Sequence, residues 1–382
     1  MPTVINENAI ELAQSLAVDI ATRAGEADRA GRLPEEDVTS LRKSGFLALV
    51  VPREFGGWGE SLLTCVAAQL ELAKGSASTA LVAAMQHQVV GHQCETRTWR
   101  PDAYERIMSE AAAGGLLNHL GSEPRMGSPS RGGLPETTAT PTADGQNLLL
   151  NGHKTWATGG RHLTHLLVRA TFGDEAGVVL VRQLPGETAI GVEWVDTWRD
   201  VLSLRATDSH DILFRDVVAP LDNLIETGEA KAVPNVWFAT MLSAVYLGAA
   251  TAARDALIRY ALDRTPTALG KPIATLPKIQ RQIGEIDVVL MAARALLFET
   301  AAGWSGKDED RPRMMARVAA TKVAVSTAAN EATEKAMQAA GGASLTSALP
   351  LERYFRDVRA AGMQPPAGDT GYEIVGRAAL GL

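Results

Sequence analysis

Residues 116–160 constrain the fold of this chain most, because short apolar segments alternate there with small, hydroxyl-bearing and glycine residues. Gly-Ser-Glu-Pro occupies 121–124, and Lys-Thr-Trp-Ala-Thr-Gly-Gly occupies 154–160. Between them, Asp144-Gly145 predicts a hairpin turn, and a second turn is predicted at Asn151-Gly152 after the apolar run 148–150. Hydroxyls, backbone N–H groups and an indole, with little bulk between them, suit contact with a flat aromatic cofactor.

The composition excludes several classes of protein. A chain of 382 residues predicts two or three subdomains. A net charge of −7 without a basic block argues against a nucleic-acid partner. Two cysteines cannot build a disulfide scaffold and fit a reducing compartment. We find no apolar run approaching the ~20 residues of a membrane span and no leader-like start, so we expect a cytoplasmic protein without a membrane partner.

The hydrophobic period changes twice along the chain. Helical spacing dominates to residue 114, a period of two from 115 to about 220, and helical spacing again from Pro234. This order predicts an α+β, mostly helical protein with a central antiparallel β-domain and a C-terminal four-helix bundle. Helices are expected at 5–24, 34–44, 61–74, 78–94, 101–113, 234–264, 277–304, 310–341, 350–360 and 370–380. Strands are expected at 116–120, 137–142, 147–150, 165–171, 178–182, 192–196 and 211–218.

The stretch around residues 116–160 resembles the flavin-binding β-domain of the acyl-CoA dehydrogenase superfamily. That family has Thr/Ser-Glu-Pro-x-x-Gly-Ser followed by Asn-Gly-x-Lys-x-Trp-x-Thr. This chain has Ser122-Glu123-Pro124 with Gly-Ser at 127–128, and Asn-Gly-His-Lys-Thr-Trp-Ala-Thr at 151–158. The resemblance extends along nearly the whole chain. It implies an N-terminal helical domain at 1–114, a barrel-like flavin-contacting domain at 115–225 and a helical bundle at 226–382.

The resemblance implies a site for FAD, with FMN as the alternative. Trp156 would flank the isoalloxazine, Thr158 would reach its N5/O4 edge, and Ser122 and Ser128 would line the other side. Trp156 and Thr158 are one strand period apart, which predicts that both project to the same face. The competing interpretation is a half-buried Trp–Thr pair on an ordinary sheet.

Three further positions follow from the same resemblance. Arg264 would bind the flavin pyrophosphate in a bidentate fork, although an arginine at a helix end is also a routine dipole partner. Gln338, Gly341 and Gly342 form a Gln-x-x-Gly-Gly turn that reaches the cofactor of a neighbouring subunit in the family. This implies a homo-oligomer, dimer or tetramer. A Gly-Gly pair is otherwise a simple helix C-cap.

The chain departs from the family at the catalytic base. Counting from Arg356-Asp357, the family's glutamate position falls on Pro365, and the family's alternative base position falls near Phe238. A positioned base contributes roughly 10²–10⁴-fold in rate. Asp369 or Glu373 would replace it only if the 360–370 loop folds differently. The catalytic residue therefore stays unassigned.

Three functions follow. The leading one is an FAD-dependent oxidoreductase that dehydrogenates an acyl-CoA-like thioester by hydride transfer to flavin N5, with an electron-transfer partner. The second is a two-component monooxygenase that uses reduced flavin, supplied by a reductase, and O₂. The third is a catalytically decayed flavin-binding assembly protein. Nitroalkane oxidases also need a carboxylate base and are disfavoured.

The same resemblance assigns Phe238, Met363 and Gln364 to the substrate pocket. No metal is expected, because His162 and His165 have a zinc-like spacing without a companion carboxylate or cysteine.

Overall fold

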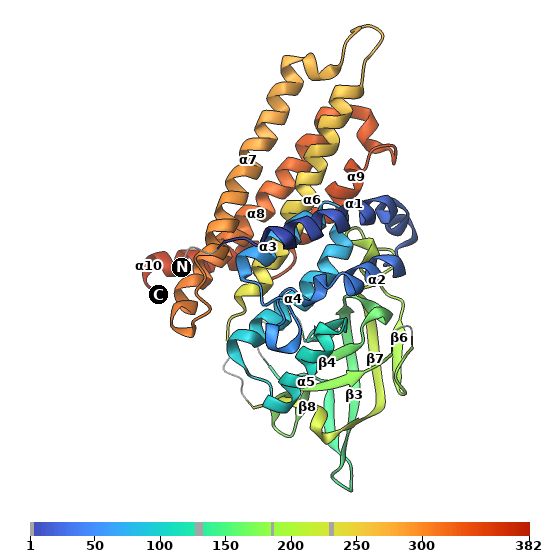
Figure 1. Cartoon of the computed structure of the whole chain (residues 1–382), viewed down its shortest axis with the longest axis vertical. Coiled ribbons are helices and arrows are strands. Elements are labelled where there is room, and N and C mark those ends of the chain that lie inside the picture. The colour runs from blue at the N-terminus through green and yellow to red at the C-terminus, as the bar shows by residue number, and fades with distance from the viewer. Residues whose placement is uncertain (1–3, 127–132, 185–186, 229–232) are drawn as a thin grey trace.

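The fold places a helical layer between a β-sheet and a tall helical bundle (Figure 1). The computed structural model describes residues 4–126, 133–184, 187–228 and 233–382. In these ranges the chain forms helices α1–α5, then strands β1–β8, then helices α6–α10. The expected order of helices, strands and helices is confirmed.

The five N-terminal helices begin where the sequence provides capping residues. Asn6, Ser61 and Ser76 each accept a backbone N–H in the first turn of the helix that follows. Gly31, at φ 61°, ends the first helix in the left-handed conformation that glycine adopts most easily. The helices are α1 (Glu7–Ala30), α2 (Glu35–Lys43), α3 (Leu62–Ala73), α4 (Ala77–Thr96) and α5 (Pro101–Ala112).

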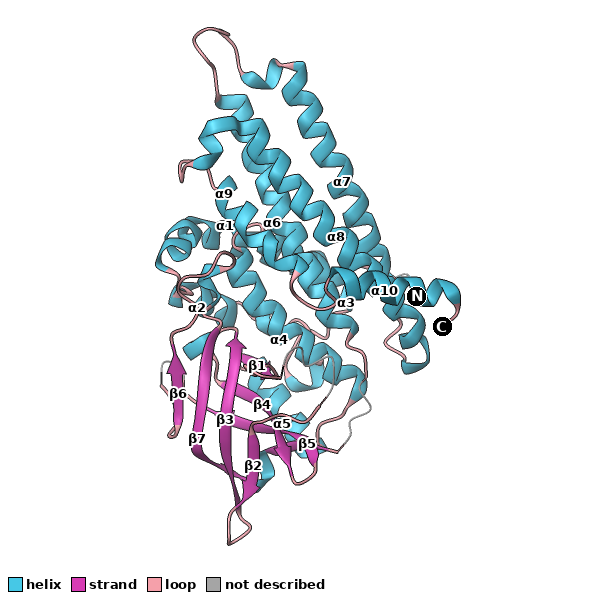
Figure 2. Ribbon diagram, turned by 180° about the vertical axis from the view of Figure 1, so that it is seen from behind, coloured by secondary structure: helices cyan, strands magenta, loops and turns pink. Residues whose placement is uncertain are grey.

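The described part of the sheet has its strands in the order β6-β7-β3-β2-β4-β5-β8, and β1 pairs with β4 off this path. Figure 2 shows the first four strands of that order side by side. The β1–β4 and β2–β4 pairings are parallel, and the other pairings are antiparallel. The strands are β1 (Leu117–Leu120), β2 (Thr138–Pro141), β3 (Asn147–Ala157), β4 (His165–Phe172), β5 (Glu175–Arg182), β6 (Val192–Val195), β7 (His210–Pro220) and β8 (Leu224–Thr227).

Strand β3 runs through Asn151-Gly152, where the sequence predicted a turn. That prediction is wrong, because β3 continues to Ala157 and pairs with β7 on both sides of Gly152. A Cβ at Gly152 would lie 2.3 Å from Oγ1 of Thr137. Glycine is therefore required here for the close approach of two backbones, and a glycine in a strand interior often marks such an approach. The sequence also missed β8.

The C-terminal bundle consists of three long helices with two shorter ones against them. Helix α8 packs against α6, α7, α9 and α10. The C-terminal ends of α6 and α8 lie toward the top of Figure 1, away from the sheet. The helices are α6 (Val236–Asp263), α7 (Pro277–Ala302), α8 (Arg311–Ala340), α9 (Leu351–Asp357) and α10 (Gly368–Leu380).

Helix α6 is the central core helix of the protein. Contrary to our expectation from the sequence, an 18-residue stretch of α6 is apolar enough to cross a membrane, but 89% of that stretch is buried inside the protein. It packs against α3, α4 and α8. A Cβ at Gly248 would lie 2.4 Å from the carbonyl oxygen of Leu70, so this glycine allows α6 and α3 to approach closely. The apolar composition of α6 reflects burial within the fold.

A buried ion pair joins the two sequence clusters around β3. The Nζ of Lys154 lies 2.6 Å from Oε1 of Glu123, and both side chains are at most 1% exposed. The two Glu123 oxygens also accept the backbone N–H groups of Glu136 and Thr137. Burial raises the pKa of Glu123, but the hydrogen bonds from Lys154 and Thr137 outweigh it and leave the pKa below its ordinary value. The Ser-Glu-Pro and Asn-Gly-x-Lys motifs thus form one structural unit.

Removal of one partner of this pair should destabilise the protein strongly, because the other charge stays buried without compensation. We expect Lys154→Met to lower the free energy of unfolding by about 3–5 kcal/mol. The double variant Glu123→Gln/Lys154→Met should lose less than the sum of its single changes.

Urea unfolding followed by circular dichroism measures both effects. Arg215→Met is the matched control, since Arg215 forms an exposed ion pair with Glu193 on the same sheet and should cost no more than about 1 kcal/mol. Equal losses for Lys154→Met and Arg215→Met would contradict the structural role of the buried pair.

Candidate functional site

Trp156 lies at a bulge near the end of β3 and faces outward. Lys154 pairs with Ile212 of β7, and Ala157 pairs with His210. Two residues therefore separate the paired positions on β3 where one separates them on β7. Trp156 has φ 57°, which is uncommon for a residue with a side chain, and it is 60% exposed. Such strained positions persist only when the surroundings impose them, and they cluster at functional sites.

Thr158 does not share the environment of Trp156, and the prediction that both side chains project to one face is wrong. Thr158 follows the strand and is buried, at 8% exposure. The bulge at Trp156 breaks the alternation on which the prediction depended. The Thr158 hydroxyl lies 2.9 Å from that of Ser209, which lies 2.7 Å from that of Thr207. These hydroxyls form a buried cluster that begins two residues after Trp156, and the sequence analysis did not predict it.

Of the two serines predicted for this site, the structure describes one. The carbonyl oxygen of Ser122 accepts the backbone N–H of Thr155, so Ser122 lies beside the bulge, next in sequence to the buried Glu123. Ser128 lies outside the described residues. The structure thus brings Ser122, Trp156 and Thr158 together.

Arg264, Gln338, Gly341 and Gly342 are not brought to this site within one protomer. Arg264 follows α6 directly and is exposed, while Gln338, Gly341 and Gly342 are exposed at the end of α8. Both helix ends lie at the far end of the bundle in Figure 1, whereas the bulge lies near the end of β3, at the edge of the sheet that faces the helical layer (Figure 2). Within one chain, the predicted cofactor residues therefore form two separate groups.

The predicted substrate residues lie along α6 and the segment after α9. The amide oxygen of Gln364 accepts a 2.5 Å hydrogen bond from the Tyr246 hydroxyl. Phe238 lies eight residues earlier on α6, which corresponds to about 12 Å along the helix axis. Met363, by contrast, is 80% exposed.

The segment after α9 holds no carboxylate in place of Pro365. Asp369 and Glu373 are both exposed on α10, and Glu373 lies 4.0 Å from Arg377. Burial raises the pKa of Asp357 to about 6, but its Oδ1 accepts the backbone N–H of Leu204 and so holds a loop of the sheet. Its place between α9 and that loop favours a structural role.

Lys322 is a buried charge that the sequence analysis missed. It lies on α8, is 1% exposed, and its Nζ donates to the carbonyl oxygens of Ala361 and Gln364. It also donates to the Ser326 hydroxyl and lies 5.9 Å from the ring centroid of Tyr246. These bonds fix the segment that carries Met363 and Gln364. Burial lowers the pKa of Lys322 to about 8.

The lowered pKa of Lys322 predicts that its contribution to the free energy of unfolding increases as the pH rises above about 8. Because the pKa is lowered in the folded state, the unfolded chain binds more protons between pH 8 and about 10.5. Relative to Lys322→Met, the wild-type protein should gain up to about 3 kcal/mol of unfolding free energy across that window.

Urea unfolding at several pH values measures the difference between the two proteins. Lys278→Met, which changes an exposed lysine of α7, is the control and should follow the wild-type curve. A constant difference between wild type and Lys322→Met from pH 7 to 10.5 would contradict the prediction.

Comparison with known proteins identifies the family. In chain order, the sequence matches the profiles of the N-terminal domain (residues 9–97), middle domain (119–217) and C-terminal domain (240–364) of acyl-CoA dehydrogenase. It is 35% identical over 358 residues to the putative acyl-CoA dehydrogenase YdbM of Bacillus subtilis, covering 93% of this chain and 92% of that protein.

Two solved structures share the fold. TdsC from Paenibacillus sp. A11-2, solved with FMN and indole, has a TM-score of 0.85 at 25% identity and covers 98% of this chain and 97% of its own. Butyryl-CoA dehydrogenase from Megasphaera elsdenii has a TM-score of 0.85 at 22% identity, with the same two coverages. The chain belongs to the acyl-CoA dehydrogenase family.

Proposed function

We propose that the protein is an FAD-dependent oxidoreductase that dehydrogenates an acyl thioester. The observation that carries this proposal is the exposed indole of Trp156 at a strained bulge, beside a buried cluster of hydroxyls. A flat aromatic cofactor would cover that indole, and family membership supports a flavin. When bound, a flavin would accept a hydride from the substrate.

The residues around the bulge fit the ring system of a flavin. Trp156 offers an uncovered aromatic face, half-buried Ser122 lies beside the bulge, and the hydroxyl of buried Thr158 lies next to that of Ser209. The Glu123–Lys154 pair fixes the backbone that carries all three. In this proposal Ser122 and Trp156 contact the flavin ring, Thr158 reaches its edge when its hydroxyl turns away from Ser209, and Ser128 extends the same surface.

The distal residues serve the site of a partner subunit. Arg264 is an exposed cation suited to a pyrophosphate, and Gln338, Gly341 and Gly342 form an exposed turn at the same end of the bundle. Because one chain keeps the two groups apart, a complete site needs a second copy. The proposed assembly is therefore a homodimer or a tetramer built from such dimers.

Mixed oligomers test this arrangement directly. Trp156→Ala and Arg264→Ala should each weaken flavin binding when purified alone. If the two residues belong to different subunits, unfolding and reassembling the two variants together should restore about a quarter of the wild-type sites. Fluorescence titration with FAD measures the recovered fraction. Sites built within one chain would give no recovery.

The choice between the possible reactions depends on whether the protein has a catalytic base. Dehydrogenation needs a group that removes the α-proton, and the side chain of Pro365 contains no group that accepts a proton. The second candidate is therefore a monooxygenase that uses reduced flavin from a reductase, and similarity to TdsC, a dibenzothiophene monooxygenase solved with FMN, favours it. A decayed flavin-binding assembly protein is the third. The protein in each case is proposed to be cytoplasmic, with Phe238, Met363 and Gln364 along the substrate.

Anaerobic titration of the flavin-loaded protein with acyl-CoAs of different chain length distinguishes these functions. A dehydrogenase should lose the absorbance of its oxidised flavin with at least one of them. A monooxygenase should bind oxidised flavin weakly and turn over only with added reductase and O₂. Stable flavin without any redox change in either assay would contradict both enzymatic proposals.

A further inference from the structure

A chain of three buried hydroxyls leads from Thr158 into the protein. Oγ1 of Thr158 lies 2.9 Å from Oγ of Ser209, which lies 2.7 Å from Oγ1 of Thr207. The Thr207 hydroxyl in turn lies 2.9 Å from the carbonyl oxygen of Leu204. The three residues are at most 8% exposed, so their hydroxyls satisfy one another inside the protein.

The three protons of this chain have two possible arrangements, because a hydroxyl carries one proton and two lone pairs. In the inward arrangement, Thr158 donates to Ser209 and Ser209 donates to Thr207. Thr207 then donates to the carbonyl oxygen of Leu204. In the outward arrangement, Thr207 donates to Ser209 and Ser209 donates to Thr158. The Thr158 proton then points out of the chain, toward an acceptor that the chain itself does not contain.

Reversal of the chain leaves no buried acceptor without a donor. The carbonyl oxygen of Leu204 loses the Thr207 hydroxyl in the outward arrangement. It still accepts Nε1–H of Trp198 at 3.0 Å and the backbone N–H of Thr207 at 3.2 Å. Two donors match its two lone pairs. The direction of the chain is therefore decided at its outer end, by the group that Thr158 meets.

The backbone at the inner end of the chain is held in place. Leu204 has φ 54° and Asp208 has φ 46°, so both lie in the left-handed region, on either side of the short 3₁₀ turn Arg205–Thr207. The backbone N–H of Leu204 donates to Oδ1 of Asp357 at 2.8 Å. Rotation of the three hydroxyls is therefore sufficient to reverse the chain, and the backbone stays where it is.

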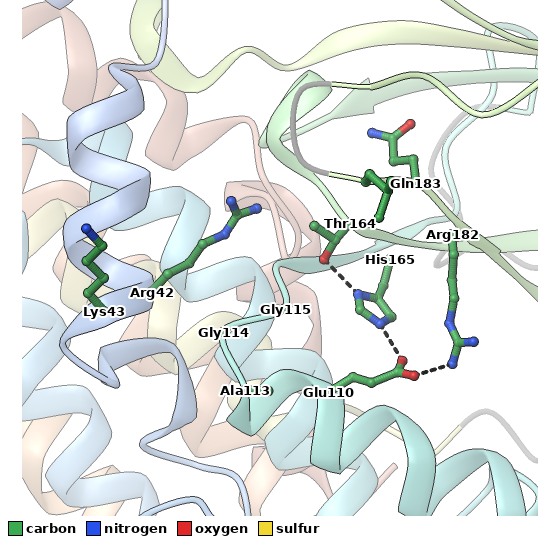
Figure 3. Close-up of a pocket in the computed structure, with 11 residues that line it drawn as sticks. Arg42, Lys43, Glu110, Ala113, Gly114, Gly115, Thr164, His165, Arg182 and Gln183 are labelled. Atoms are coloured by element: carbon green, nitrogen blue, oxygen red, sulfur yellow. Dashed lines mark hydrogen bonds and ion pairs between the residues drawn. The ribbon is translucent and has the colours of Figure 1, made fainter.

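Another chain that contains a hydroxyl has a fixed direction. It lies between α5, β4 and β5 (Figure 3). Arg182 donates to one oxygen of Glu110, and the other oxygen lies 2.6 Å from Nε2 of His165. Nδ1 of His165 lies 2.8 Å from the Thr164 hydroxyl, and burial lowers the pKa of His165, which favours the neutral ring. A guanidinium only donates and a carboxylate only accepts, so charged groups fix this direction. The chain that begins at Thr158 consists of hydroxyls and has no such charged end.

We propose that this chain allows the cofactor site to bind both redox states of a flavin, with Ser209 and Thr207 as positioning residues that set the direction of the Thr158 hydroxyl. N5 of an oxidised flavin accepts a hydrogen bond, which suits the outward arrangement. N5–H of a reduced flavin donates one, which suits the inward arrangement because Thr158 can then accept it. Hydrogen bonds to the ring nitrogens tune a flavin. The inference rests on the proposed flavin site, and it holds for either flavin reaction.

Thr207→Val removes the inner end of the chain and should favour oxidised flavin. Without the Thr207 hydroxyl, the inward arrangement leaves the proton of Ser209 buried without an acceptor, which is costly. Ser209 therefore donates to Thr158, and Thr158 donates outward in both redox states. The affinity for reduced FAD should fall at least about tenfold relative to that for oxidised FAD. A tenfold change in this ratio lowers the two-electron midpoint potential by about 30 mV.

Reductive titration of the FAD-loaded proteins against a reference dye measures these potentials. Ser209→Ala interrupts the chain and should lower the potential as Thr207→Val does. Thr207→Ser restores the hydroxyl and should return the potential to the wild-type value. Ser203→Ala is the matched control, because its hydroxyl donates to the carbonyl oxygen of Asp357 outside the chain. It should also keep the wild-type potential.

Infrared difference spectra of the wild-type protein test the same claim even if the variants do not fold. O–H stretching bands that shift in D₂O should differ between the oxidised and the reduced FAD-loaded protein. Absence of such bands, or a wild-type potential in folded Thr207→Val, would overturn this proposal while the flavin site stands. A wild-type protein that binds no FAD in either redox state would overturn both the proposed function and this inference.

Discussion

The buried ion pair between Glu123 and Lys154 is the interaction on which the candidate site depends. Both charges lie in the interior, which is costly unless each is paired and hydrogen-bonded, and here Glu123 satisfies two further backbone N–H groups. The pair fixes the segment after β1 against β3. Glu123 is one residue beyond Ser122, and Lys154 is two residues before Trp156. The strained backbone at Trp156 is held by this anchor and by the pairing of β3 with β7.

The sheet and the helical bundle contribute different parts of the proposed site. The sheet provides an exposed indole, and the bundle provides a core and a distant pair of exposed helix ends. Lys322 links them in part, because it holds the segment after α9 against α6 and α8 through backbone carbonyls. Buried charges thus fix both the proposed flavin surface and the proposed substrate segment.

The sequence predicted the architecture closely and the geometry of the site only partly. Helix positions follow from apolar period and caps, which are local, and α7 and α8 agree with expectation to within two residues. The bulge at Trp156 depends on pairing with β7, more than 50 residues away, so strand period alone placed Thr158 wrongly. Gly152 looked like a turn because its close contact with Thr137 is tertiary. The burial of Lys322 could not be predicted from the sequence, because its partners are backbone carbonyls and no residue type marks them.

A crystal structure of the protein with FAD tests the central claim most directly. The account predicts that the isoalloxazine covers the indole of Trp156 beside Ser122 and Thr158, while Arg264 and the turn at 338–342 of the partner chain contact the rest of the cofactor. A flavin bound elsewhere, with Trp156 still open to solvent, would contradict it.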